Sequence, residues 1–118
     1  MEALIVDDEE ELGLITSKIL KKKGIDSKDV TTIADAEIQI REKNYGIYFL
    51  DLHLPDGSGF DLIPQIREKN KNAAIVIISA YDYYEELKKA DFYEVNAFIK
   101  KPFTGYEILQ TVDQILKK

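Results

Sequence analysis

The chain has 118 residues, of which 45% are hydrophobic, and this length and composition suit one compact domain with a single core and exclude intrinsic disorder. It has 16 Lys and Arg residues against 22 Asp and Glu residues, and the net charge of −6 argues against direct binding to nucleic acids or anionic membranes. The lack of cysteine excludes disulfide bonds and thiolate metal sites. We find neither a signal peptide nor a membrane span in the sequence, and we therefore expect a cytoplasmic protein.

The beginning of the chain predicts a strand followed by a helix. The apolar run Leu4-Ile5-Val6 is typical of a buried strand, and hydrophobic residues recur at helical spacing over residues 9–23. Glu9, Glu10 and Glu11 lie in the first turn of this helix, where acidic side chains interact favourably with the helix dipole. Gly24 is expected to end the helix.

The next two elements have weaker patterns. The β-branched run over residues 30–33 predicts a second strand. Residues 34–41 alternate between apolar and polar side chains, which by period alone indicates a strand. We nevertheless assign residues 35–43 to a helix, because two neighbouring parallel strands require a crossover connection.

The middle of the chain contains the most continuous hydrophobic run. Ile47-Tyr48-Phe49-Leu50 is typical of a central strand in a parallel sheet, and it ends at Asp51. A turn-rich loop follows over residues 55–59, and hydrophobic residues at helical spacing over 60–66 mark a third helix. Pro64 falls inside that pattern and is expected to loosen or kink the first turns.

The last part of the chain predicts a strand over residues 74–78, a helix over 83–94, a strand over 97–99 and an amphipathic helix over 104–118. Five hydrophobic residues form the expected buried face of the last helix: Ile108, Leu109, Val112, Ile115 and Leu116. Strands and helices therefore alternate as (βα)5, without a linker or repeat. We predict one α/β domain over residues 1–118, a doubly wound five-stranded parallel sheet with helices on both faces.

Polar side chains follow the predicted strands at the edge where open parallel sheets bind their ligands. These residues are Asp7 and Asp8 after the first strand, Asp51 at the end of the third, Ser79 at the end of the fourth and Lys101 after the fifth. Three acids, one hydroxyl and one amine are therefore expected to meet on one rim of the sheet.

The chemistry of this set favours phosphoryl transfer with a metal ion. Three crowded carboxylates repel one another, so at least one is protonated unless a cation lies between them. Oxygen ligands without His or Cys suit Mg²⁺, with Mn²⁺ as an alternative, and phosphate oxygens can complete the coordination. Lys101 can neutralise a transferring phosphoryl group and Ser79 can donate a hydrogen bond to it. Asp51, the only acid ending the central strand, is the candidate nucleophile.

In these motifs the chain resembles, from end to end, the CheY-like receiver domains of bacterial two-component response regulators. The matching residues, in order, are Leu4-Ile5-Val6-Asp7-Asp8-Glu9, Phe49-Leu50-Asp51, Pro55-Asp56-Gly57, Gly59, Ser79-Ala80 and Lys101-Pro102-Phe103. The resemblance implies the strand order 2-1-3-4-5.

The resemblance also implies a phosphoacceptor function. Asp51 would receive a phosphoryl group from a phosphohistidine on a sensor histidine kinase or a histidine phosphotransfer protein. Asp8 would bind Mg²⁺ directly together with Asp51, Asp7 would hold one of its waters, and the main-chain carbonyl of His53 would supply another ligand. Such a domain is not a conventional enzyme, because it catalyses only its own aspartyl phosphorylation and dephosphorylation.

A switching mechanism follows from the same resemblance. Ser79 and Lys101 would contact the phosphoryl group, and Phe98 takes the place of an aromatic switch residue. Movement of the Ser79 hydroxyl towards the phosphate leaves space into which the Phe98 ring can turn. The surface formed by the elements over residues 83–94, 97–99 and 104–118 would then change, and it would bind a downstream protein or a second copy of the chain.

Structural interpretations of the same residues are also open. Asp7 and Asp8 could merely cap the first helix, and Phe98 could be an ordinary core residue. Lys100 is a neighbour of Lys101, but alternation along the strand sends the two side chains to opposite faces, and the position before Pro102 favours Lys101.

The one histidine, His53, lies two residues after Asp51, where it could contribute only its carbonyl. The alternative hypothesis is that His53 and Tyr81 shield the aspartyl phosphate from water and set its lifetime. Tyr81 could equally belong to ordinary helix packing or to a partner surface, where tyrosine is enriched.

Two other functions suit the same fold. A phosphorylation-independent protein-interaction module is the main alternative, and the complete acid set argues against it. A phosphatase or phosphotransferase with an Asp nucleophile commonly needs a second acid two residues later, where this chain has His53. A stand-alone receiver and a piece of a longer regulator or hybrid kinase are both consistent with the sequence.

Overall fold

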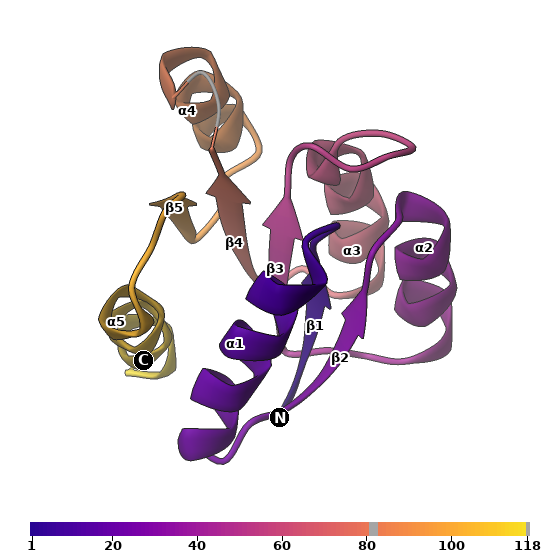
Figure 1. Cartoon of the computed structure of the whole chain (residues 1–118). Coiled ribbons are helices and arrows are strands. Elements are labelled where there is room, and N and C mark those ends of the chain that lie inside the picture. The colour runs from indigo at the N-terminus through magenta and orange to yellow at the C-terminus, as the bar shows by residue number, and fades with distance from the viewer. Residues whose placement is uncertain (81–82, 118) are drawn as a thin grey trace.

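Hydrophobic runs form the middle of a parallel sheet in the computed structural model, which describes residues 1–80 and 83–117 (Figure 1). The strands of this part of the chain are β1 (Glu2–Val6), β2 (Asp26–Val30), β3 (Ile47–Asp51), β4 (Ala74–Ser79) and β5 (Ala97–Lys100). Their order is β2-β1-β3-β4-β5 and each neighbouring pair is parallel, which confirms the doubly wound fold. The nearly continuous burial of β1, β3 and β4 explains why these strands read as apolar runs.

Helices cover both faces of the sheet (Figure 1). The described helices are α1 (Glu10–Lys22), α2 (Ile33–Glu42), α3 (Ile63–Lys69), α4 (Tyr83–Phe92) and α5 (Gly105–Leu116), with a short 3₁₀ helix η1 (Gly59–Leu62) before α3. None of them has the length and apolar content needed to cross a membrane.

Alternation along β3 divides the core into two layers. Tyr48 and Leu50 belong to the layer that also contains buried residues of α2, η1 and α3. Ile47 and Phe49 belong to the layer under α1 and α5. The side chains of one central strand therefore hold both helical layers against the sheet.

The prediction of a second strand over residues 30–33 is wrong. β2 covers Asp26–Val30, and Ile33 already begins α2. β2 is an edge strand with mostly exposed, polar side chains, so it lacks the hydrophobic pattern that reveals the inner strands. The predicted helix over residues 35–43 is present but begins earlier, with Thr32 as its N-cap, whose hydroxyl accepts a hydrogen bond from the Asp35 N–H at 3.1 Å.

Pro64 lies at the start of the third helix and does not kink it. The residues before it form the 3₁₀ helix η1, and α3 begins at Ile63, so Pro64 lies in the first turn, where its missing N–H is not needed. The buried face predicted for the last helix is correct at Ile108 and Val112. It is wrong at Leu116, which is 46% exposed because it is the last residue of the helix.

Candidate functional site

The carboxyl ends of the strands bring the predicted polar residues to one rim of the sheet. Asp51 is the last residue of β3 and Ser79 the last residue of β4. Lys101 follows β5, and its main-chain N–H donates a hydrogen bond to the Ser79 carbonyl at 2.8 Å. Asp7 follows β1, and its N–H donates to the carbonyl of Val30 at 3.1 Å. The pairing of the sheet thus continues one residue beyond the strands and aligns the rim.

The Lys101 ammonium is the centre of the site. Its Nζ lies 3.1 Å from Oδ2 of Asp51, 3.3 Å from Oδ2 of Asp7 and 2.7 Å from Oε1 of Glu9. Burial by itself lowers the pKa of Lys101, but the hydrogen bond with Glu9 and the charges of Asp7 and Asp51 outweigh it and hold the pKa above its ordinary value. Lys101 is therefore the positive charge that allows these carboxylates to lie together.

The acids form a compact cluster of oxygen donors. Asp7, Asp8, Glu9 and Asp51 each offer a carboxylate oxygen, and these atoms lie within 4.8 Å of one another. Burial, together with the nearby Asp51 carboxylate, raises the pKa of Asp7 to about 6. The pKa of Asp8 is also raised, by burial and then by Asp51. A set of hard oxygen ligands whose charges repel one another fits a divalent cation such as Mg²⁺.

A cavity of about 320 Å³ opens beside this cluster. It is lined by Asp8, Glu9, Asp51, His53, Ala80 and Lys101. The exposed His53 side chain lies at the cavity, and its main-chain N–H donates a hydrogen bond to Oδ1 of Asp51 at 3.1 Å. Ser79 is completely buried next to Ala80, whereas Tyr81 lies outside the described residues.

The loop after Asp51 is folded tightly back onto β3. A Cβ atom added at Gly59 would overlap the main-chain oxygen of Asp51 and lie 3.0 Å from the Leu50 side chain, so only glycine allows this approach. The same loop is attached to α2, because the Asp56 carboxylate accepts a hydrogen bond from the Ile33 N–H at 2.8 Å. These contacts hold the end of β3, and therefore the Asp51 carboxylate, in place.

The positions of Lys100, Asp7 and Phe98 bear on the other roles predicted for them. Lys101 points among the acids whereas Lys100 is exposed, as alternation along β5 predicts. Asp7 lies just before α1, where its Oδ1 accepts the Glu9 N–H at 2.9 Å, and the same carboxylate contacts Lys101. Phe98 is partly buried against the core layer that also includes residues of α2, α3 and α4, which agrees with its core interpretation and keeps it next to α4.

Glu9 is the site residue that sequence reasoning missed. The sequence predicts only that Glu9, like Glu10 and Glu11, interacts favourably with the dipole of the first helix. In the structure its carboxylate makes the shortest of the three contacts with Lys101. A signal was available, because Glu9 directly follows Asp7-Asp8 at the carboxyl end of β1. The strand end that places two acids on the rim also places the next residue within reach of it.

The raised pKa of Asp7 predicts how stability depends on pH without divalent cations. An unfolded Asp loses its proton near pH 3.8, whereas Asp7 in the folded protein loses it near pH 6. Between these values the folded state binds more protons, so the free energy of unfolding should fall by about 3 kcal/mol as the pH rises. Above pH 6 this contribution is constant. Urea unfolding at a series of pH values measures it.

Asp7→Asn provides the comparison for this pH dependence. The variant cannot titrate at this position, so the fall in stability between pH 4 and pH 6 should be smaller than in the parent protein. The same pH profile in both proteins would show that Asp7 titrates normally. An exposed control, Asp35→Asn, should reproduce the parent profile.

Comparison with known proteins shows which sequences and structures this chain is similar to. The family profile described as response regulator receiver domain matches residues 3–113. The sensory transduction protein LytT of Enterococcus faecalis is 35% identical over 124 residues, which cover 100% of this chain and 49% of LytT. The chain spans about half the length of the curated relatives it matches.

Solved structures have the same fold. The non-phosphorylated receiver domain of HemR from Leptospira biflexa superimposes with a TM-score of 0.90 at 30% identity, covering 99% of this chain and 94% of that one. The BeF3-activated receiver domain of DrrB, a Thermotoga maritima protein, has a TM-score of 0.90 at 22% identity, covering 99% of this chain and 97% of that one.

Proposed function

The chain belongs to the family of response regulator receiver domains, which act in two-component signalling, and from this premise we propose that Asp51 is its phosphoacceptor. The observation that carries the proposal is the Lys101 ammonium 3.1 Å from the Asp51 carboxylate, inside a cluster of further acids. A carboxylate nucleophile, a fixed cation and a cavity beside both are the parts that phosphoryl transfer requires.

The reaction would use a phosphohistidine of a histidine kinase or a phosphotransfer protein. A carboxylate oxygen of Asp51 attacks the phosphorus, a P–O bond forms, and the P–N bond breaks with its electron pair left on the donor imidazole. Lys101 is protonated and close enough to neutralise charge on the phosphoryl oxygens. The Ser79 hydroxyl would donate a hydrogen bond to one of them. The chemistry of the chain is thereby limited to phosphorylation and dephosphorylation of its own Asp51.

The acid cluster is suited to the metal ion of this reaction. Mg²⁺, or Mn²⁺ in its place, would supply positive charge to the phosphoryl oxygens when bound. Asp8 and Asp51 would be direct ligands with the main-chain carbonyl of His53, and Asp7 would hold a water. The raised pKa values of Asp7 and Asp8 support this assignment, because a divalent cation relieves the repulsion that contributes to them.

Transmission of the signal would run through Ser79 and Phe98. Phe98 is only partly buried beside α4, so its ring has room to repack when the loop after β4 moves. The surface of α4, β5 and α5 would then bind a downstream protein or a second copy of the chain, without direct contact to nucleic acid or membrane. We place this signalling in the cytoplasm.

Incubation with acetyl phosphate and Mg²⁺ tests the proposal. Intact mass spectrometry should show the addition of one phosphoryl group, and none when EDTA is present. A chain that gains no mass although it is folded would favour the phosphorylation-independent interaction module. Sustained turnover of a small phosphate ester would instead favour a phosphatase.

The lifetime of the aspartyl phosphate should depend on His53. The side chain is exposed and lines the cavity, where it can restrict the approach of water to the phosphoryl group. We expect His53→Ala to lose phosphate severalfold faster after removal of the donor, as measured by mass spectrometry over time. A rate equal to that of the parent protein would leave His53 only its main-chain role.

A further inference from the structure

The three hydrogen-bond donors of the Lys101 ammonium are all engaged in the structure. They contact Asp51 at 3.1 Å, Asp7 at 3.4 Å and Glu9 at 2.7 Å. An ammonium group has three N–H bonds, so Lys101 has no further donor to offer in this arrangement. A phosphoryl group that arrives at Asp51 can bind Lys101 only if one of these contacts is released.

The three partners differ in how easily they can leave. The side chains of Asp7 and Asp51 are 5% and 4% exposed, and each also accepts a main-chain N–H, from Glu9 and from His53. The Glu9 side chain is 57% exposed. Glu9 is the N-cap residue of α1, but its carboxylate makes no capping bond within the described helix. Glu9 is therefore the partner that can move into solvent at the smallest cost.

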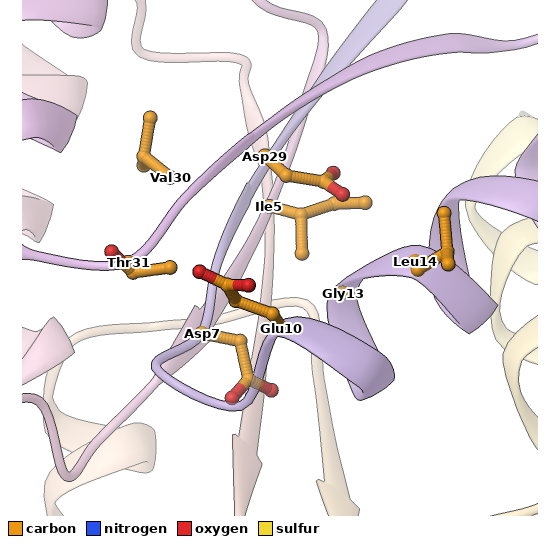
Figure 2. A pocket seen from close by; sticks show the side chains of 8 residues that line it. All are labelled: Ile5, Asp7, Glu10, Gly13, Leu14, Asp29, Val30 and Thr31. Atoms are coloured by element: carbon orange, nitrogen blue, oxygen red, sulfur yellow. The ribbon is translucent and has the colours of Figure 1, made fainter.

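Glu9 also lines the cavity through which a phosphoryl group must approach Asp51. Its carboxylate carries the same sign of charge as that group and makes the shortest contact with the cation that the group needs. The neighbouring acid Glu10 does not line this cavity, and the described contacts of Lys101 do not include it. Figure 2 shows the Glu10 side chain in a separate pocket with Asp29. In the same view the Asp7 carboxylate points away from the Glu10 carboxylate.

Building on the proposed function, we propose that Glu9 is a positioning residue that holds Lys101 before phosphorylation and competes with the phosphoryl group for its ammonium. Release of Lys101 by Glu9 is then a step in forming the phosphorylated state. The Glu9 carboxylate would thus control the availability of Lys101 from the edge of the Asp51 site, without touching the reacting atoms.

Glu9→Gln tests this competition, because it removes the charge and keeps the size of the side chain. With saturating Mg²⁺, the dissociation constant of BeF3, a phosphoryl mimic, should fall by roughly three- to tenfold, the range set by a partly exposed ion pair. Isothermal titration calorimetry measures it. Glu10→Gln removes the same charge one residue along the chain and should match the parent protein.

Phosphorylation kinetics provide a readout that a purely structural role would not change. In Glu9→Gln the acetyl phosphate concentration for half-maximal rate should fall by the same factor, while the maximal rate changes less. A variant that only disturbed the fold would lower the maximal rate or the melting temperature instead. The circular dichroism melt of Glu9→Gln should match that of Glu10→Gln.

Each outcome decides between clear alternatives. Equal BeF3 affinity in Glu9→Gln and the parent protein overturns the competition and leaves the phosphoacceptor proposal intact. Weaker BeF3 binding together with weaker Mg²⁺ binding makes Glu9 a metal ligand and also overturns it. A parent protein that binds neither BeF3 nor phosphate overturns the proposed function, and the competition with it.

Discussion

Asp51→Asn is expected to abolish phosphate incorporation while the protein stays folded. The amide has nearly the size of the carboxylate, but it offers no anionic oxygen to attack phosphorus. Removal of the nucleophile should therefore lower the rate by at least roughly a thousandfold. The measurement is intact mass after incubation with acetyl phosphate and Mg²⁺. Circular dichroism melting checks that the loss is chemical.

The specificity of this result depends on the other acids of the rim. Asp7, Asp8 and Glu9 each have a carboxylate oxygen within 4.8 Å of a carboxylate oxygen of Asp51, so any of them is close enough to be an alternative acceptor. Phosphate that is still incorporated in Asp51→Asn would identify another acceptor and contradict the assignment. Asp35→Asn, an exposed change in the first turn of α2, is the matched control and should be phosphorylated like the parent protein.

Lys101→Met is expected to produce the second large effect, on stability as well as on phosphorylation. The variant removes the only cation that contacts the buried Asp7 and Asp51 carboxylates within the described residues. Removal of one partner from a buried charge pair typically costs about 3–5 kcal/mol, because the other charge stays buried without compensation. We expect a loss near 3 kcal/mol in EDTA at pH 7, since protonation of Asp7 absorbs part of it. Urea unfolding measures this difference.

Mg²⁺ should restore much of the lost stability in Lys101→Met. A divalent cation bound by the same acids supplies the charge that the ammonium provided, so the difference from the parent protein should shrink as Mg²⁺ is added. Phosphorylation should stay slow, because the phosphoryl oxygens still lack their cation. Lys100→Met, one residue earlier and exposed, is the matched control. An equal loss in both variants would show that Lys101 has no special role in the cluster.

Much of the fold could be predicted from hydrophobic pattern alone. β1, β3 and β4 lie inside the sheet and are buried on both faces, so their sequences are continuous apolar runs that end where the strands end. α1 and α5 pack one face on the sheet and keep the other exposed, which produces helical spacing of their hydrophobic residues. The pattern is strong wherever burial is one-sided or complete.

The failure at β2 has the opposite cause. An edge strand has one neighbour, and most side chains of β2 are exposed, so a polar sequence is tolerated there. Its conformation is imposed by pairing with β1, from Glu2 opposite Asp26 to Val6 opposite Val30. Such pairing joins residues far apart in the chain and leaves no local signal. The sequence therefore favours the β-branched residues at the junction of β2 and α2 over the true strand.

The sequence by itself determined which chemistry the rim could carry. Residues at strand ends are identified as soon as the strands are, so Asp7, Asp8, Asp51 and Lys101 could be assigned to one edge before any coordinates. Parallel strands in one sheet must bring their carboxyl ends together, and this geometric necessity needs no knowledge of side-chain positions.

Only the tertiary structure decided how the charges of that rim are paired. Contacts of 2.7–3.4 Å depend on the direction of each side chain, which follows from packing between elements distant in sequence. In this way Glu9, which by local pattern is one acid of a helix start, becomes the nearest partner of Lys101. The sequence predicts that Asp51 meets a cation. The position of Glu9 at the start of α1, within 2.7 Å of the Lys101 ammonium, determines that Asp51 shares this cation with another acid.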